Sequence, residues 1–195
     1  MTYELKEYSD TEIGGEDFSK SDLSEKTFYN CTFKECNFSE TLLNETDFDS
    51  CEFIDCNFTN SVIKQTKLND IIFSRCKLMG LNFYECSQFS FNLIFTDCSI
   101  NSCNYSDLKM KGSKFTKCKI TDSYFQETFL AGVSFEGSNF KNTLFHNANL
   151  VGASFCNASG YSIDPLVNNV RKAKFTVPDV LNLLSGFNIE IKDCD

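Results

Sequence analysis

The chain of 195 residues is long enough for one domain with an apolar core, and its formal net charge is −9. Nucleic acid and anionic membranes are polyanions, so this charge argues against either one as the direct partner. No apolar run is long enough to span a bilayer, and the first residues lack the basic and apolar regions of a signal peptide, so we expect a cytoplasmic protein.

From residue 18 onward, a large apolar residue recurs at every fifth position. One series runs from Phe18 to Phe83 and a second from Ile100 to Phe155, giving 26 matches that use fifteen of the 21 Phe residues. A small or medium residue lies two positions before most of them, often followed by Asp or Asn. Helices repeat apolar residues every three or four positions and strands every two, so five fits neither. It predicts a chain that turns a corner every five residues, with two side chains inward and three outward.

The register slips by two residues between these series. We therefore expect segment 87–92 to form a small bulge on an otherwise regular surface. Bulges in regular ladders often mark functional positions, which makes Gln88, Ser90 and Asn92 candidates for partner contact. The alternative is a tolerated insertion without a role.

Most of the cysteines fall at the small inward position of the repeat. Free Cys is among the most buried residue types, and spacings of five and twenty match no common zinc pattern such as C-x₂-C. We predict packing rather than metal binding or disulfides. The nine are Cys31, Cys36, Cys51, Cys56, Cys76, Cys86, Cys98, Cys103 and Cys118.

The sequence offers no set of residues for catalysis. The single histidine, His146, follows the inward Phe145 and should point to solvent. Without a second His, a partner nucleophile or a glycine-rich phosphate loop, no nucleophile–base pair can be assembled. We expect neither an enzyme nor a cofactor.

Charge is distributed unevenly along the chain. Residues 1–60 carry a net charge of −11, residues 61–125 carry +4 and residues 126–195 carry −2. Asp47, Asp49, Glu52 and Asp55 all fall at outward positions of their repeats and are candidate partner contacts. Such acids either maintain solubility or form an acidic cylinder that suits a basic groove.

The tail from residue 160 onward has a different pattern. Thr176 and Asp179 are spaced as a capping box, and Gly186 is placed to end a helix of about ten residues. Residues 187–191 then alternate like a strand. A helix this short needs its apolar face buried, against the last coil, a second chain or both. The candidate dimerisation residues are Val180, Leu181, Leu184 and Phe187.

The small–Asp/Asn–Leu/Phe–x–x pattern, as in Cys36-Asn37-Phe38 and Ala148-Asn149-Leu150, resembles the pentapeptide-repeat family over residues 18–155. The resemblance implies an all-β, right-handed quadrilateral β-helix of four repeats per coil, here about seven coils and roughly 34 Å long. We expect residues 1–17 to form an N-terminal cap, residues 18–158 the β-helix and residues 159–195 a C-terminal helix and strand that cap and dimerise.

The tail is also similar to the ends of the Qnr quinolone-resistance proteins and the microcin B immunity protein. It shares Ser162-Ile163-Asp164-Pro165, a basic linker, a Leu-rich helix and Gly186. This resemblance implies a tail-to-tail homodimer that mimics DNA, engages DNA gyrase or topoisomerase IV, and protects it from quinolones or a peptide toxin. The alternative is a pentapeptide-repeat scaffold with another protein partner.

Overall fold

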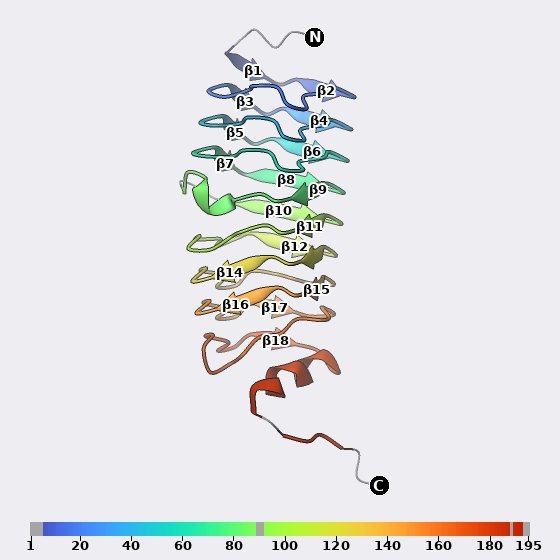
Figure 1. Cartoon of the computed structure of the whole chain (residues 1–195), viewed down its shortest axis with the longest axis vertical. Helices are drawn as coiled ribbons and strands as arrows, with labels where there is room; N and C mark the ends of the chain where they lie inside the picture. Colours follow the sequence, from blue (N-terminus) through green and yellow to red (C-terminus); the bar gives the residue numbers. More distant parts are fainter. Residues whose placement is uncertain (1–5, 89–91, 188, 193–195) are drawn as a thin grey trace.

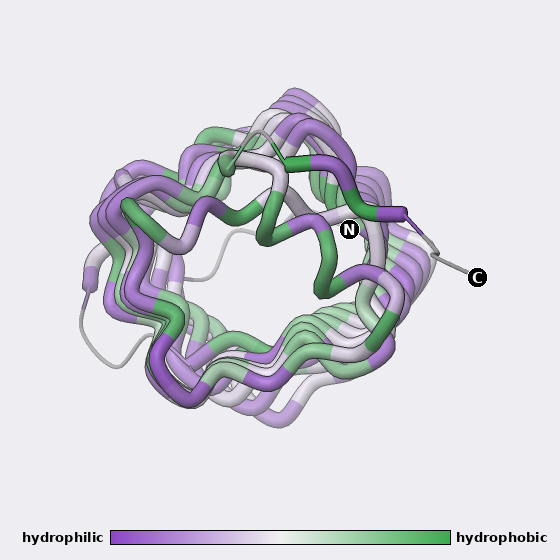
Figure 2. Tube along the Cα trace, turned by 90° about the horizontal axis from the view of Figure 1, so that it is seen from below, coloured by the Kyte–Doolittle hydropathy of each residue, from purple (hydrophilic) through white to green (hydrophobic). Residues whose placement is uncertain are grey.

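The computed structural model describes residues 6–88, 92–187 and 189–192. They form a parallel β-solenoid of about eight turns, drawn as a rod in Figure 1, with one short helix at its C-terminal end. Seen along the rod in Figure 2, successive coils lie over one another and enclose a four-sided interior. The predicted fold class is therefore confirmed.

Four faces follow one another around each coil. The first face carries β1 (Glu7–Ser9), β3 (Thr27–Tyr29), β5 (Asp47–Asp49) and β7 (Lys67–Asn69). The second carries β2 (Glu12–Gly14), β4 (Thr32–Lys34), β6 (Glu52–Ile54), β8 (Ile71–Ser74), β10 (Leu93–Thr96), β12 (Lys114–Thr116), β17 (Ser154–Phe155) and β18 (Lys174–Phe175). The third carries β9 (Lys77–Met79), β11 (Ser99–Asn101), β13 (Lys119–Thr121) and β15 (Asn139–Lys141). The fourth carries the 3₁₀ turn η1 (Phe83–Glu85), β14 (Tyr124–Gln126) and β16 (Leu144–His146).

Each strand pairs in register with the strand one coil away. The offset is 20 residues, as in Glu7↔Thr27, except across the slip, where Ile71 pairs with Leu93. We number the coils one to eight as residues 6–25, 26–45, 46–65, 66–85, 86–107, 108–127, 128–147 and 148–167, with residues 168–175 starting a further turn.

The corners explain the period of five. Almost every fifth residue adopts the left-handed backbone conformation, with φ of 60° at Glu25, 50° at Asn30 and 52° at Glu35. Non-glycine residues rarely adopt this conformation unless their surroundings hold them there. The next coil supplies that support, because the corner N–H of Asn30 donates to the carbonyl of Asp49 at 2.9 Å. Each corner therefore depends on its neighbouring coil.

Stacked aromatic rings fill the interior. Phe28 stacks on Phe48 one coil later, with ring centroids 5.1 Å apart and planes 12° apart. Phe28 also meets Phe33 of the next face edge to face, at 5.3 Å and 72°. Offset stacks and edge-to-face contacts are the two favoured aromatic geometries. The repeat provides both in most coils, so a rod only one coil wide still has a dense core.

The solenoid extends beyond the predicted repeats at both ends. Tyr8 and Ile13 continue the spacing of five before Phe18, and β1 and β2 pair with β3 and β4. Residues 6–17, which we assigned to an N-terminal cap, thus belong to the first coil. At the other end, Phe175 stacks on Phe155 at 5.2 Å. These additions raise the predicted seven coils to about eight.

Among the described residues, no helix has the length and apolar character needed to cross a membrane.

Candidate interaction surfaces

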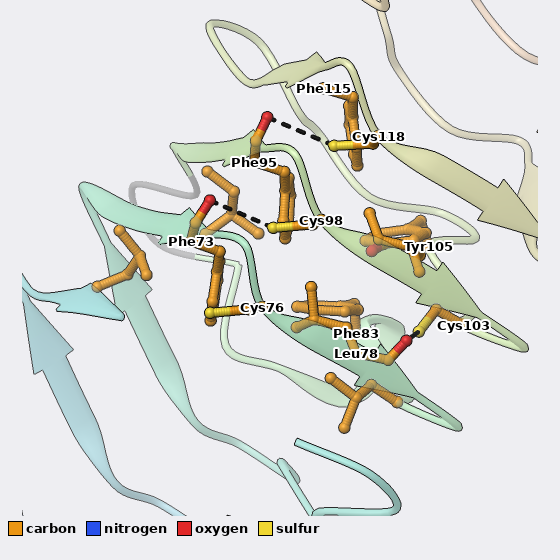
Figure 3. Packing of buried hydrophobic residues seen from close by; sticks show 14 of the residues in the cluster. Phe73, Cys76, Leu78, Phe83, Phe95, Cys98, Cys103, Tyr105, Phe115 and Cys118 are labelled. Carbon is orange, nitrogen blue, oxygen red and sulfur yellow. Dashed lines mark hydrogen bonds between the residues drawn. The ribbon is translucent and has the colours of Figure 1, made fainter. Parts of the chain in front are cut away.

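The nine cysteines at the inward position are all buried, as predicted. Their thiols donate hydrogen bonds to main-chain carbonyls of the preceding coil, as Cys98 does to Phe73 at 3.3 Å and Cys118 to Phe95 at 3.5 Å (Figure 3). Ser and Thr use the same position in the same way, and Ser61 donates to Phe38 at 2.6 Å. The position therefore selects for a small side chain with one hydrogen to donate.

Burial also makes these thiols poor nucleophiles. It raises the pKa of Cys51 to about 12 and that of Cys103 to about 12. The thiolate is the reactive and metal-binding form, so both side chains are protonated and inert near neutral pH. No group of three His, Cys, Asp or Glu side chains that could hold a metal ion occurs within the described ranges.

The four candidate acids of coil three lie on two adjacent faces, and two of them are engaged within the rod. Asp47 forms an ion pair with Lys67 at 2.8 Å, and Asp55 accepts two hydrogen bonds from Arg75, at 2.8 and 2.6 Å. The Arg75 guanidinium lowers the pKa of Asp55 by hydrogen bonding. Each base is one coil beyond its acid, in the same ladder position. Asp49, which accepts from Ser50 at 2.9 Å, and Glu52 complete the surface.

The predicted bulge lies where the register slips. Lys67 still bridges to Ser87 in the first register, and Leu93 pairs with Ile71 in the second, so the two extra residues fall between them. Gln88 is exposed. The Asn92 amide donates to Asp70 at 2.9 Å, which anchors the end of the segment to coil four. Ser90 lies outside the described residues.

The C-terminal segment differs from the predicted capping box. Thr176 Oγ1 accepts a hydrogen bond from the Asn157 N–H at 3.0 Å, and Asp179 Oδ1 accepts one from the Gly160 N–H at 2.9 Å. Both side chains therefore secure the tail to the last full coil and do not cap a helix. The chain then forms the 3₁₀ helix η2 (Asp179–Phe187).

The apolar side chains of η2 point in two directions. Leu183 packs against the core, so η2 contributes to covering the end of the rod. Leu181, Leu184 and Phe187 are exposed, while Val180 is half-buried. Residues 189–192 form no strand, contrary to the alternation we interpreted as one, because they lie beyond the last coil and meet no strand edge (Figure 1). The four candidate dimerisation residues thus surround one apolar end of the molecule.

His146 is exposed on β16, as expected from its neighbour Phe145. Its ladder partner one coil earlier is Gln126.

Our sequence interpretation missed one surface feature. Coil six carries five exposed lysines within eleven residues, on three faces of the rod: Lys109, Lys111, Lys114, Lys117 and Lys119. The signal was present in the spacing, but we had counted it only as part of a weakly basic middle third.

The comparisons with known proteins agree with this architecture. The family model for the pentapeptide repeat region matches residues 26–93 and 46–125, and the model for pentapeptide repeats (8 copies) matches residues 124–159. The search of curated proteins gives no match.

Solved structures are similar to the chain in fold. A trypsin-treated form of QnrB1, a plasmid-mediated fluoroquinolone resistance protein, is 16% identical, with a TM-score of 0.62 over 93% of this chain and 99% of that one. HetL, a pentapeptide repeat protein involved in heterocyst differentiation regulation from the cyanobacterium Nostoc sp. strain PCC 7120, is 13% identical, with a TM-score of 0.42 over 86% of both chains. From its repeats, its coils and the family models together, we conclude that the chain belongs to the pentapeptide-repeat family.

Proposed function

We propose that the protein is a DNA-mimicking binder of a type II topoisomerase, DNA gyrase or topoisomerase IV, and protects it from a quinolone or a peptide toxin. The observation that carries this proposal is the similarity to QnrB1 over nearly the whole of both chains. Because QnrB1 confers fluoroquinolone resistance, a rod of the same fold with an acidic end is a reasonable candidate for the same class of target.

The acidic coils supply the contact surface in this proposal. Residues 1–60 carry a net charge of −11, and coil three presents four acids on adjoining faces. A groove that binds DNA is basic, so its attraction to these coils is electrostatic and screened by salt. Asp47 and Asp55 are already paired with bases of coil four. Asp49 and Glu52 are therefore the acids best placed to meet a partner.

Gyrase supercoiling in the presence of a fluoroquinolone, over a titration of this protein, tests the proposal. We expect activity to be restored, and we expect Asp49→Lys with Glu52→Lys to weaken direct binding to the enzyme at least tenfold. Glu25→Lys with Glu40→Lys, which makes the same charge change at other exposed corners, is the matched control. Wild-type protein that neither binds the enzyme at low salt nor restores supercoiling would favour a scaffold with a different protein partner.

The proposal includes a homodimer through the C-terminal end. Leu181, Leu184 and Phe187 are each between 36% and 45% exposed, and they extend an apolar surface that also includes Val177. Apolar side chains gathered at one end of a rod typically mark a contact with another chain. A two-fold axis there would join two rods tail to tail.

Sedimentation velocity at tens of micromolar tests this dimer. Leu181→Asp with Leu184→Asp should give monomers whose far-UV circular dichroism is unchanged. Asn182→Asp with Ser185→Asp adds the same charge to other exposed positions of η2 and should leave the dimer intact. A wild-type monomer under these conditions would contradict the tail-to-tail rod.

A further inference from the structure

Coil six has a different surface from the rest of the rod. Its five lysines are all exposed, and no acid interrupts them between Asp107 and Asp122. Like charges this close repel one another, which destabilises the coil unless counter-charges are present.

Elsewhere in the rod, the ladder supplies those counter-charges. Lys67 and Arg75 each pair with an acid at the same position one coil earlier. The lysines of coil six have other neighbours in register: Phe129 beside Lys109, Ile94 and Ser134 beside Lys114, and Ser99 and Asn139 beside Lys119. No ion pair joins any of the five to a residue in the described part of the chain.

The first face continues this basic surface toward the C-terminus. Its ladder runs from Lys109 through Phe129 and Asn149 to Asn169. The outward positions beside that ladder hold only small, apolar or basic residues: Lys111, Gly112, Ala131, Gly132, Val151, Gly152, Arg171 and Lys172. The face thus has lysines at one end, Arg171 and Lys172 three coils or ~14 Å away, and no acid between them.

An exposed aromatic ring lies within this surface. Phe129 is 40% exposed and pairs in register with Lys109, so ring and ammonium belong to adjacent coils of one face. Lysines that neutralise phosphates, together with an aromatic ring that accepts a base, are the two elements with which proteins bind single strands. The small residues around Phe129 leave room for a base to approach. An extended acidic peptide would use the lysines but would have no need for the ring.

We propose that this surface, the first face from coil six onward together with the coil-six lysines, binds a single-stranded nucleic acid. Lys109 and Lys111 contact the phosphate backbone, and Phe129 stacks against a base. The net charge of −9 opposes such binding for the chain as a whole, but its acids concentrate in coils one to three. Coil three lies ~14 Å from coil six, beyond the Debye length of about 8 Å at physiological salt, so the two surfaces act separately.

Fluorescence anisotropy with a dye-labelled oligothymidylate of about 20 nucleotides tests the proposal, using the full chain without any topoisomerase. We expect binding at 50 mM salt that weakens linearly with the logarithm of salt concentration. Lys109→Glu with Lys111→Glu should weaken it at least tenfold. Lys64→Glu with Lys141→Glu, the same charge change on the fourth and third faces, should change it less than threefold. Phe129→Leu, which keeps an apolar side chain, should weaken it about fivefold or more.

Three results would overturn the proposal. One is the absence of binding by folded wild-type protein at 50 mM salt. Another is equal weakening by the two lysine pairs, which would indicate only diffuse attraction. The third is a silent Phe129→Leu with polyglutamate competing as well as the oligonucleotide, which would identify an acidic protein surface as the partner. None of these outcomes depends on the topoisomerase proposal, because that enzyme is absent from the assay.

Discussion

The ring of Phe95 stacks on that of Phe73, with centroids 5.1 Å apart and planes inclined by only 7°, although 22 residues separate them. Elsewhere in the rod, the equivalent rings are 20 residues apart, as Phe33 and Phe53 are at 4.9 Å. The two extra residues are therefore accommodated on the outside of the rod, and the core continues without a gap. A change at the surface of one coil need not disturb the packing of the next.

The inward cysteine position should tolerate threonine better than valine. Cys56 donates to the Phe33 carbonyl at 3.4 Å, and Ser61 and Thr66 make the equivalent bond from the same position. Cys56→Thr keeps that donor, so we expect its free energy of unfolding to stay within about 1 kcal/mol of wild type. Cys56→Val has nearly the same shape without the donor and should be about 1 kcal/mol less stable than Cys56→Thr. Urea denaturation of both variants measures the difference; equal stability would mean that only size matters here.

Gly160 should be far less replaceable than Gly132. Both have positive φ, 70° and 73°. A Cβ on Gly132 would meet nothing within 4 Å, whereas one on Gly160 would lie 2.3 Å from the Phe140 carbonyl oxygen. We expect Gly132→Ala to cost about 1 kcal/mol for the backbone conformation alone and Gly160→Ala about 3 kcal/mol or more. Thermal and urea unfolding of the pair provides the comparison, and similar losses would show that the backbone near Gly160 moves aside readily.

Tyr105 should be more stable as phenylalanine. The ring is fully buried between Phe83 and Phe125, and its hydroxyl finds no hydrogen-bond partner among the described residues. An unpaired buried hydroxyl costs free energy that its removal recovers. We therefore expect Tyr105→Phe to raise the free energy of unfolding by up to about 1 kcal/mol. Tyr124→Phe, at an exposed position, is the control and should have no effect. A loss of stability in Tyr105→Phe would reveal a partner for the hydroxyl.

Stability should fall between pH 9 and pH 12. Burial raises the pKa of Cys51 and of Cys103 from 9.0 to about 12, so the folded state holds both protons more tightly than the unfolded chain. Their contribution is complete below pH 9 and is lost as pH rises toward 12, at up to about 1.4 kcal/mol per pH unit for each thiol. The variant Cys51→Thr with Cys103→Thr lacks both titrations and should show a shallower decline in urea unfolding at pH 8 and pH 10.5. Parallel declines would assign the effect to other groups.

The sequence predicted the solenoid well because its fold depends on a strictly local rule. Each inward position is recognisable from its own five residues, and the nine inward cysteines could be identified without knowing any contact. The first coil escaped notice because Tyr8 and Ile13 lack the small–Asp/Asn pattern before them. They share only the spacing, which is a weaker signal than the motif.

The tail and the lysine surface required the structure because they depend on distant parts of the chain. Thr176 and Asp179 have the spacing of a capping box, but their hydrogen-bond donors, the N–H groups of Asn157 and Gly160, lie 19 residues earlier. Local spacing cannot reveal such partners. Similarly, a regional charge of +4 conceals five lysines on one coil, because acids elsewhere in the same region offset them in the sum.

The dependence of each corner on the coil beside it has a consequence for how such a protein changes in length. A coil makes its main-chain hydrogen bonds only to the coils directly before and after it, so stability is close to a sum of nearest-neighbour terms. Duplication or deletion of one 20-residue unit would therefore leave every remaining contact intact. It would also move the acids of coil three and the lysines of coil six apart, or together, by ~4.8 Å. Relatives that differ by whole coils could thus match partners of different span, with both charged surfaces retained unaltered.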